Sequence, residues 1–432
     1  MTLKSPYNVI LSPNSFKEWI SSMEAAGIIK EGIIELCVER NIKPLPEFEI
    51  IPIGDGGEGT IDAIFNAGIG GQYITVDAID PLGRPIQAEY LSLPGQKKTA
   101  FIEMARVAGL YLIEPSYRNP LKTTSYGVGM LIKNAFELGH EIIIVGVGGA
   151  GTHDGGVGMA QALGVEFFDQ YGNKKPLYMC NESLEDVVNW ELGDLASNIR
   201  DKAKIYVASD VTNPLLGENG ASRVFGRQKG ATTGQIEILE KNLTILSDIT
   251  EPKLKTEDKG SYGNKIKWHF GNYNADTDYR HIRGSGAAGG LPYGLVAFVD
   301  ANIDSGINIV LDLVNFKTRI SNADLVVTGE GKLDKTTFGG KAVMGVGSST
   351  KRVAFLEKRV GSLNVVAVCG CVGDYYEGFE EDIAKYLNGL YIASPKQLDI
   401  SEVRQNGAAY LKSAAKRMFE DASNGKFTYN LK

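Results

Sequence analysis

The feature that most constrains this chain is a set of four glycine-rich turns, most of which carry an acidic residue. They cover residues 50–60, 142–158, 281–291 and 324–334, and three of them follow an apolar, β-branched stretch typical of a strand. Glycine lets backbone N–H groups approach an anion, and a helix start just beyond adds partial positive charge. Because an acidic side chain beside phosphate needs a cation between them, the turns favour magnesium–nucleotide chemistry.

Composition supports this interpretation and excludes several classes of protein. The chain has 52 glycines among 432 residues, about 12% where ~7% is typical, and they cluster in these turns. Its net charge of −7, without a block of Lys or Arg, argues against a nucleic-acid partner. No apolar run approaches the ~20 residues of a membrane span, and the first residues lack a signal-peptide core, so a cytoplasmic protein is expected. Cys369 and Cys371 are expected to be reduced core residues.

Alternation of strand and helix patterns predicts an α/β fold. We expect two α/β domains, one of them doubly wound with a mostly parallel sheet, and an active-site cleft between them. Residues 1–75 and 288–432 share the strand–helix alternation and form the doubly wound domain. Residues 76–287 form an inserted mixed α/β domain that begins with an antiparallel meander. The charged stretch 250–280 is expected to be an exposed excursion.

The expected elements are as follows. Strands are predicted over 7–13, 48–53, 72–79, 85–93, 99–105, 141–147, 203–210, 323–329, 364–370 and 389–393. Helices are predicted over 17–38, 58–67, 126–139, 156–164, 235–249, 287–301, 341–357 and 401–420.

Polar groups at the first two strand ends have two interpretations each. Lys17 follows the first strand, at the end of the sheet where α/β proteins bind ligands. The alternative is structural: Asn14 or Ser15 caps a helix, and Lys17 is a solvated surface lysine. Asp55 and Glu58 flank a double glycine before a helix. They suit either Mg²⁺ coordination or an ordinary turn and helix start, and the residues leave both open.

The second turn, residues 142–158, contains a dinucleotide-type fingerprint, Gly146, Gly148 and Gly151, after a strand. It predicts a nicotinamide-dependent oxidoreductase as an alternative function. The fit is imperfect because four further residues precede the expected helix. Of these, His153 suits capping or packing, whereas Asp154 is the better nucleotide or metal candidate.

Two later strand ends complete the candidate set. Asp210 follows one strand, with a polar turn as its ordinary explanation. Glu330, Asp334, Thr336 and Lys341 follow another, where an exposed loop with salt bridges would look the same. Because several strand ends share glycine and a carboxylate, chance is a poor explanation. There is no Walker A sequence, protein-kinase catalytic loop or serine-hydrolase triad.

The chain resembles the bacterial glycerate kinases of the first type over nearly its whole length. The motifs that carry the resemblance include NSFKEWISSMEAA, PIGDGGEGTIDA, DPLGRPIQAEY, GVGGAGTHDGGVGMAQALG, ASDVTNPLLGENGASRVFGRQKGA, GSGAAGGLPYGL and ADLVVTGEGKLDKTTFGGK. The resemblance implies ATP-dependent, Mg²⁺-assisted phosphorylation of D-glycerate, with 2-phosphoglycerate as the expected product. Small molecules are then the partners, and a homodimer is a candidate assembly.

The resemblance also assigns site residues. Lys17 would neutralise phosphate or the substrate carboxylate, and Asp55, Glu330 and Asp334 would coordinate the metal or activate the hydroxyl. Asp210 is a further catalytic acid. Substrate and nucleotide contacts are expected from Asn14, Ser15, Gly56, Gly57, Gly148, Gly149, Asp154, Arg283, Gly286, Thr336 and Lys341.

Several residues depart from the family's usual motifs. Asn14 stands where Asp is usual, Trp19 where a small residue is usual, and Gly339 where His is usual. These departures leave two alternatives open. One is a kinase of a related small hydroxy acid, and the other is an inactive family member that acts as a binding protein.

Overall fold

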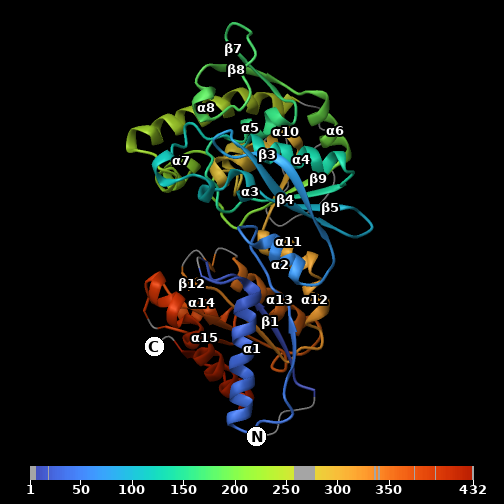
Figure 1. Ribbon diagram of the computed structural model, residues 1–432, viewed down its shortest axis with the longest axis vertical. Helices are drawn as coiled ribbons and strands as arrows, with labels where there is room; N and C mark the ends of the chain where they lie inside the picture. Colours follow the sequence, from blue (N-terminus) through green and yellow to red (C-terminus); the bar gives the residue numbers. More distant parts are fainter. Residues whose placement is uncertain are drawn as a thin grey trace. The chain divides into compact units, whose positions relative to one another are not determined.

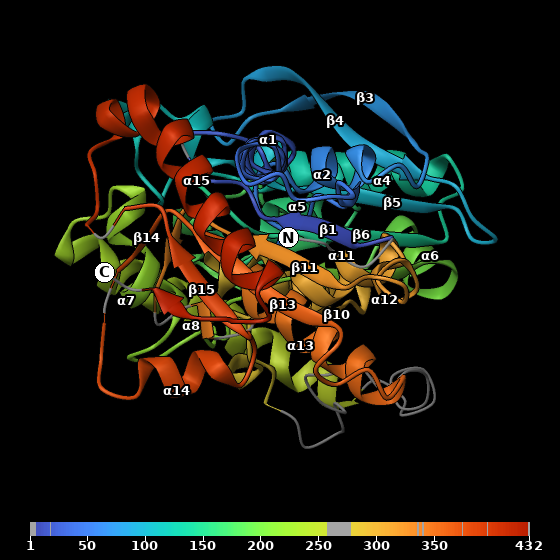
Figure 2. The ribbon, with the colours of Figure 1, turned by 90° about the horizontal axis from the view of Figure 1, so that it is seen from below.

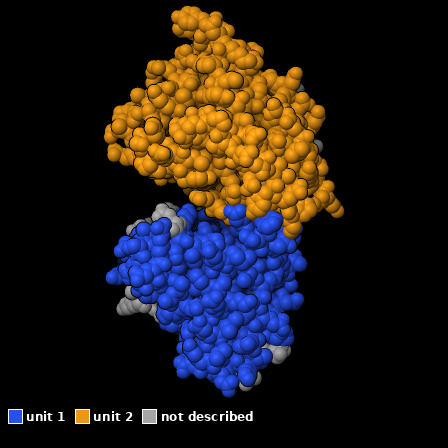
Figure 3. Space-filling model, in the orientation of Figure 1, with its two compact units in different colours: residues 1–55, 62–69, 307–432 blue, residues 56–61, 70–306 orange. Residues whose placement is uncertain are grey.

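The computed structural model describes residues 6–17, 19–256, 278–334, 337–338, 341–373, 375–394 and 396–430. The chain divides into two compact units, which are coloured separately in Figure 3. Unit 1 comprises residues 1–55, 62–69 and 307–432, and unit 2 comprises residues 56–61 and 70–306. Each unit is described by itself below.

Unit 1 is built from strands and helices at both ends of the chain. Its strands are β1 (Asn8–Pro13), β2 (Glu47–Ile50), β11 (Leu325–Gly329), β12 (Lys332–Leu333), β13 (Asn364–Cys369), β14 (Cys371–Val372), β15 (Gly389–Ile392) and β16 (Tyr429–Asn430). Its helices are α1 (Ser22–Glu39), most of α2 (Thr60–Asn66), α11 (Gly306–Leu313), α12 (Phe316–Arg319), α13 (Ala342–Leu356), α14 (Phe379–Ala384) and α15 (Ile400–Ser423).

The main sheet of unit 1 is parallel throughout. Its six strands lie in the order β16-β15-β13-β11-β1-β2, and the strands β15, β13, β11 and β1 run side by side in Figure 2. The first strand of the chain pairs with a strand more than 300 residues away, with Val9 opposite Leu325 and Pro13 opposite Gly329. The carboxyl ends of these strands therefore meet at one edge of the sheet, where parallel α/β sheets bind ligands.

Helices cover both faces of this sheet, which makes unit 1 doubly wound. The long helices α1 and α15 lie against each other and pack on one face (Figure 1). That face is closed by buried residues such as Leu11, Val327, Val366 and Leu411. Helix α13 packs on β1, β11 and β13. Because every second side chain of a strand points to the same face, strands buried on both faces are apolar runs, as β11 and β13 are.

Helix α1 begins later than its apolar spacing suggests. The sequence predicts a helix from residue 17, whereas α1 starts at Ser22. The reason is a capping box, in which the Ser21 hydroxyl accepts from the Glu24 N–H at 3.2 Å and the Glu24 carboxylate accepts from the Ser21 N–H at 2.8 Å. The preceding residues form a tight loop closed by a bridge between Phe16 and Ile20.

Replacing Ser21 with alanine is expected to lower the free energy of unfolding by about 1 kcal/mol, because the Glu24 N–H loses the hydroxyl that accepts its hydrogen bond. Urea denaturation of the wild type and the variant measures this difference. Ser197→Ala, whose hydroxyl donates to the Gly193 carbonyl within another helix, is a suitable comparison. An unchanged midpoint for Ser21→Ala would contradict the assignment of the cap.

Unit 2 contains the middle of the chain. Its strands are β3 (Gln72–Ile79), β4 (Pro85–Leu93), β5 (Thr99–Glu103), β6 (Ile142–Gly146), β7 (Glu166–Asp169), β8 (Val187–Glu191), β9 (Lys204–Ala208) and β10 (Asn302–Asp304). Its α-helices are α3 (Ala105–Ala108), α4 (Tyr126–Glu137), α5 (Val157–Ala162), α6 (Asp194–Lys202), α7 (Ala221–Phe225), α8 (Thr233–Thr256) and α10 (Leu291–Val299). Short 3₁₀ helices occur at Leu110–Leu112, Pro115–Tyr117, Asn181–Leu184, Arg227–Lys229, Tyr279–His281 and Ala287–Gly289.

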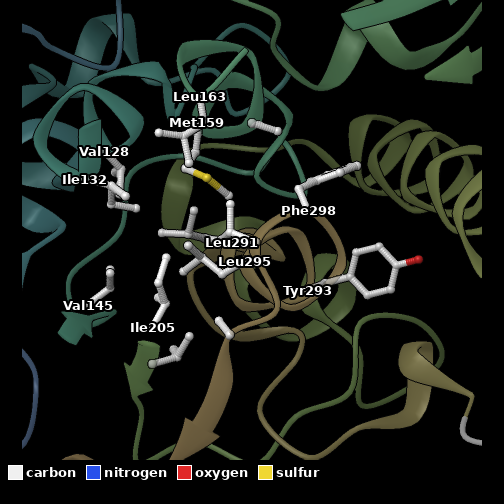
Figure 4. Packing of buried hydrophobic residues seen from close by; sticks show 14 of the residues in the cluster. Val128, Ile132, Val145, Met159, Leu163, Ile205, Leu291, Tyr293, Leu295 and Phe298 are labelled. Atoms are coloured by element: carbon white, nitrogen blue, oxygen red, sulfur yellow. The ribbon is translucent and has the colours of Figure 1, made fainter. Parts of the chain in front are cut away.

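The main sheet of unit 2 is mixed. Its strands lie in the order β10-β9-β6-β5-β4-β3. Strands β3, β4 and β5 form the predicted antiparallel meander, and β5, β6, β9 and β10 are parallel. The core of this unit joins sheet residues such as Val145 and Ile205 to Met159 of α5 and to Leu291 and Leu295 of α10 (Figure 4). The predicted α/β class with mostly parallel sheets is thus confirmed.

The bounds of the two units differ from the predicted domain limits. Residues 288–432 were predicted to belong to the doubly wound domain, yet residues 288–306 belong to unit 2. The reason is that β10 pairs with β9, with Ile303 opposite Val207, and that α10 packs in the core of unit 2. Strand β3 likewise belongs to the sheet of unit 2. A strand–helix pattern identifies the elements but not the sheet that each strand joins.

Three further expectations concern the excursion 250–280, the absence of a membrane span and the two C-terminal cysteines. Of the predicted excursion 250–280, the first residues continue α8 to Thr256 and residues 278–280 begin a 3₁₀ helix, while residues 257–277 lie outside the described part. Within the described part of the chain, no helix has the length and apolar character needed to cross a membrane. Cys369 and Cys371 are free and buried, as expected.

Candidate active site

A pocket of about 560 Å³ lies in unit 1 at the carboxyl ends of the parallel strands. Its lining residues follow β1, β11, β13 and β15, and further residues come from the start of α15. All of them belong to unit 1. The charged and polar members are Asn14, Ser15, Lys17, Asp55, Glu330, Lys332, Asp334, Lys341, Ser394, Lys396, Gln397 and Asp399. Seven predicted site residues therefore share one cavity: Asn14, Ser15, Lys17, Asp55, Glu330, Asp334 and Lys341.

The pairing of β1 with β11 brings the first two polar loops together. The Asn14 N–H donates to the Gly329 carbonyl at 2.8 Å, which extends the strand pairing by one residue. The Asn14 side chain, only 5% exposed, accepts from the Ser15 N–H at 2.8 Å. Asn14 therefore holds its own loop in shape beside Glu330, the residue that follows Gly329.

Lys17 lies in the loop between β1 and α1 and not in a helix. The Phe16 N–H donates to the Ile20 carbonyl at 2.9 Å, and the Ile20 N–H donates back to the Phe16 carbonyl at 3.1 Å. This closed loop places Lys17 on the wall of the pocket. The predicted position near a strand end is confirmed, and the predicted helical position is wrong because the cap at Ser21 starts the helix later.

Glu330 is the most buried acid in the pocket, with 8% of its surface exposed. Its Oε1 accepts a hydrogen bond from the hydroxyl of Thr337 at 2.9 Å. The same hydroxyl accepts from the Asp334 N–H at 3.2 Å, and the Thr337 N–H donates to the Asp334 carbonyl at 3.0 Å. Thr337, which is fully buried, therefore orients both Glu330 and the turn that carries Asp334. The predicted neighbour Thr336 lies outside the described residues.

The environment of Glu330 changes its acidity. The pKa of Glu330 is raised to about 7, chiefly by burial and in smaller part by the charges of Asp55 and Asp334, while the hydrogen bond from Thr337 and the charge of Lys341 oppose the shift. A carboxyl group with a pKa near 7 can take up a proton at neutral pH. The influence of Asp55, Asp334 and Lys341 also indicates that these three side chains lie close to Glu330.

The charges around this acid are balanced. Lys341 occupies the position just before α13, so its side chain enters the pocket from the start of that helix. Among the described lining residues, four lysines face four acids: Lys17, Lys332, Lys341 and Lys396 with Asp55, Glu330, Asp334 and Asp399. A pocket with this balance suits an anionic ligand that also carries or requires a cation.

The carboxylates of the pocket form an open set and not a closed metal site. In the described part of the chain, no three His, Cys, Asp or Glu side chains are grouped closely enough to hold a metal ion by themselves. The predicted three-carboxylate set of Asp55, Glu330 and Asp334 therefore does not form a closed metal cage. Magnesium usually binds through one or two carboxylates together with water and substrate phosphates, and an open pair such as Asp55 and Asp334 suits this mode of binding.

The predicted glycines of unit 2 serve close packing of the backbone. A Cβ on Gly146 would lie 2.3 Å from the Gly56 carbonyl oxygen, and a Cβ on Gly148 would lie 2.5 Å from the Gly57 Cα. The two glycine turns of this unit therefore touch each other directly. The dinucleotide-type fingerprint is explained by this contact, and α5 begins only at Val157, well after the last fingerprint glycine, Gly151. Gly149 adopts a positive φ of 72° in the same turn, and Gly286 packs against the Pro214 carbonyl.

Asp154 has a structural position. It is fully buried, and its oxygens accept hydrogen bonds from the Ser125 N–H and hydroxyl and from the Gly156 and Gly158 N–H groups. Burial raises the pKa of Asp154, while these hydrogen bonds oppose the shift. The predicted ligand contact from Asp154 is therefore wrong in this structure, because the carboxylate is enclosed and holds the turn before α5.

The other predicted residues of unit 2 lie at strand ends and on the surface. Asp210, after β9, accepts from the Ser305 hydroxyl at 3.2 Å and the Gly306 N–H at 2.9 Å. Arg283 is exposed. Their roles in catalysis and anion binding stay predictions.

A buried lysine lies beneath the same turn of unit 2. Lys229 is 2% exposed, and its Nζ donates to the Thr152 carbonyl at 2.7 Å. Burial lowers the pKa of Lys229 to about 7, with Asp154 acting in the opposite direction. His153, fully buried next to it, contacts the Ser222 hydroxyl at 3.2 Å, so it is a packing residue as expected.

The second wall of the unit 1 pocket contains none of the predicted site residues, although Trp19 was noted as a departure from the family's motifs. This wall consists of Trp19, residues 393–394 after β15, and the first turns of α15, including Ile400, Val403 and Gly407. The carboxyl-end rule that located Glu330 after β11 could have located residues 370–371 after β13 and 393–394 after β15. No comparable signal marks α15, because its pocket face carries no motif.

The fold and the pocket together define an α/β protein with an acid–lysine ligand site at the carboxyl ends of parallel strands. The model of the glycerate kinase family matches residues 9–423. Over 421 residues, the chain is 36% identical to a glycerate kinase of Halalkalibacterium halodurans, covering 97% of this chain and 99% of that protein. It is 38% identical to the glycerate 2-kinase of Escherichia coli, covering 80% and 82% of the two chains. The chain belongs to the glycerate kinase family.

A solved structure supports the same assignment. The crystal structure of putative glycerate kinase 2 from Salmonella typhimurium LT2 superimposes with a TM-score of 0.75 at 32% identity, covering 98% of this chain and 99% of that one. The resemblance inferred from the motifs is thereby confirmed, as is the prediction of an enzyme of the kinase class. The oxidoreductase alternative is set aside on the same grounds.

Proposed function

We propose that this protein transfers the γ-phosphoryl group of ATP to a hydroxyl of D-glycerate, giving 2-phosphoglycerate and ADP. The observation that carries the proposal is the convergence of Lys17, Asp55, Glu330, Asp334 and Lys341 on one pocket at the strand ends of unit 1. Phosphoryl transfer requires alignment and charge neutralisation more than covalent chemistry, and these side chains supply both.

Each side chain has a role that follows from its chemistry. Glu330 accepts the proton of the 2-hydroxyl as that oxygen attacks the γ-phosphorus and the bond to the bridging oxygen of ADP breaks. Its burial and its hydrogen bond with Thr337 keep it in one orientation. Lys17 and Lys341 neutralise the carboxylate of glycerate and the charge that develops on the transferred group.

Asp55 and Asp334 are the residues that would hold Mg²⁺, together with the phosphates of ATP. When bound, the ion would reduce the repulsion between the two anionic substrates. Repulsion between unit charges ~4 Å apart amounts to ~4 kcal/mol at an effective dielectric of ~20, so this contribution matters.

The direct test uses purified protein with Mg-ATP and D-glycerate, and follows ADP release. Phosphorus NMR of the product then distinguishes the 2-phosphate from the 3-phosphate. If the protein phosphorylated another small hydroxy acid but not glycerate, that acid would replace glycerate as the proposed acceptor. If calorimetry detected ligand binding but no phosphorylated product formed with any of these acids, an inactive binding protein would be the better description.

Replacing Lys17 with alanine is expected to reduce kcat about 100-fold, the loss typical of one group that stabilises charge in a transition state. Steady-state kinetics at saturating ATP measures this change. Lys426→Ala, which removes an exposed lysine of the same unit outside the pocket, serves as the control and should retain full activity. A Lys17→Ala enzyme with wild-type kcat would remove Lys17 from the proposed mechanism.

A further inference from the structure

The pocket of unit 1 has a second, apolar half that glycerate does not explain. The apolar lining residues are Phe16, Trp19, Leu398, Ile400, Val403 and Leu411. Glycerate consists of three carbons that carry a carboxylate and two hydroxyl groups, so no part of it is apolar. A cavity of about 560 Å³ falls in the range typical of sites for larger ligands.

Trp19 is held in place on two sides. Its ring meets that of Phe16 edge-to-face, with centroids 5.9 Å apart and an interplanar angle of 80°. Its indole also lies against Gly407 of α15, where an added Cβ would come within 2.7 Å of Cζ2. A rigid aromatic side chain on a pocket wall offers contact area at a low cost in conformational entropy.

We infer that this apolar half binds the base of the phosphoryl-donor nucleotide, against Trp19 and the first turns of α15. The inference rests on the proposed function and assigns part of the same site. A nucleoside triphosphate is a single molecule with a flat apolar end and a highly charged end. The pocket has the matching pair of surfaces: Trp19 lies against α15 at Gly407, whereas Lys341, Asp55 and Asp334 lie around Glu330. Aromatic side chains stack on bases regardless of sequence.

The acceptor is the less suitable occupant of the apolar half. A hydroxy acid with an alkyl or aryl substituent would also contact Trp19, but the donor would then have to bind its base elsewhere. The kinetic consequences differ: a change at Trp19 affects the KM for ATP if the base lies there, and the KM for the acid if the substituent lies there.

The test compares Trp19→Ala with the wild type in two measurements. In calorimetry with Mg-ADP, the Kd should rise about tenfold or more, the effect expected from removing a ring that stacks on a base. Inorganic tripolyphosphate, which lacks a base, should bind both proteins equally. In steady-state kinetics the KM for ATP should rise by a similar factor, and the KM for glycerate should change less than about twofold.

Two glycine variants provide a matched control. Gly407→Ala should displace the indole and weaken Mg-ADP binding, since the new methyl group would overlap it. Gly27→Ala lies in α1 with no atom within 4 Å of the added Cβ, and it should leave ADP binding unchanged. Trp19→Phe, which keeps an aromatic face, should recover most of the affinity lost in Trp19→Ala.

Intrinsic fluorescence tests the same point even if Trp19→Ala fails to fold. Mg-ADP should quench the wild-type emission, tripolyphosphate should not, and Trp19→Phe should lose the ADP response. A wild type that binds no nucleotide would overturn the proposed function together with this inference. A wild type that binds ADP, with a Trp19→Ala variant of unchanged ADP affinity or with a change in the glycerate KM alone, would overturn only the base subsite.

Discussion

Replacing Glu330 with glutamine is expected to lower kcat about 1,000-fold, because the variant cannot accept the proton of the attacking hydroxyl. Glutamine has nearly the same shape, and its carbonyl oxygen can still accept the hydrogen bond from Thr337. The pocket should therefore keep its geometry, and the KM for ATP should stay close to that of the wild type. Steady-state kinetics with D-glycerate and Mg-ATP measures both quantities.

The same variant should be at least as stable as the wild type above pH 7. Burial raises the pKa of Glu330 to about 7, so ionising this carboxyl group in the folded protein is unfavourable. Any stability that its protonated form contributes is present below its ordinary pKa and is lost as pH rises through 7. Loss of activity with an unchanged or higher Tm at pH 8 would separate a catalytic role from a structural one.

Glu380→Gln on the exposed first turn of α14 is the control for both measurements. It should change neither kcat nor Tm appreciably. If Glu330→Gln retained a kcat within about threefold of the wild type, Glu330 would not be the proton acceptor, since general-base catalysis contributes at least about 100-fold. Asp334 would then be the acid to test next.

The second large effect concerns stability and lies in unit 2. Lys229→Met is expected to be more stable than the wild type by about 2 kcal/mol at pH 6, since burying a charged ammonium group costs free energy that an apolar side chain of similar size does not. The gain is limited because the Thr152 carbonyl loses its donor, at a cost of about 1–3 kcal/mol.

The stability difference between Lys229→Met and the wild type is expected to change with pH. Burial lowers the pKa of Lys229 to about 7, so between pH 7 and about 10 the unfolded chain holds a proton that the folded chain has released. The free energy of unfolding of the wild type should then rise by up to about 1.4 kcal/mol per pH unit relative to the variant. The advantage of Lys229→Met should accordingly shrink and reverse as the pH rises.

Urea denaturation from pH 6 to pH 10 tests this dependence. His153 and Asp154, the titratable groups that interact with Lys229, remain in both proteins. Lys241→Met, on the exposed face of α8, is the matched control and should follow the wild type at every pH. Parallel curves for the wild type and Lys229→Met would mean that Lys229 keeps its ordinary pKa despite its burial.

Local patterns predicted most of the secondary structure correctly. Strands β3 and β4 have the predicted bounds because alternating residues and an Asp80-Pro81-Leu82-Gly83 turn define them locally. The start of α1 was missed although its signal, Ser21 followed by Glu24, is present in the sequence. The assignment of residues 288–306 failed for another reason: which sheet β10 joins is decided by pairing with β9, about 100 residues earlier, and no local pattern records it.

The part of the site that directly follows the parallel strands was predicted from the sequence. Residues that follow β1 and β11 were placed correctly because each lies directly after an apolar strand. The contact between Trp19 and Gly407 was not predicted, since it joins a loop to a helix nearly 400 residues away in the sequence. Asp154 was misjudged because a carboxylate that binds a ligand and one that caps a buried turn have the same sequence context.

The pairing of β1 with β11 also determines the order in which the molecule can be completed during synthesis. Unit 2 ends at residue 306, so its sheet can be assembled before β11, which begins at Leu325, leaves the ribosome. Until β11 has been synthesised, the edge of β1 that pairs with it is uncovered. An uncovered aliphatic strand edge is prone to aggregate. The sheet of unit 1 therefore cannot be completed until the C-terminal third of the same polypeptide has been synthesised.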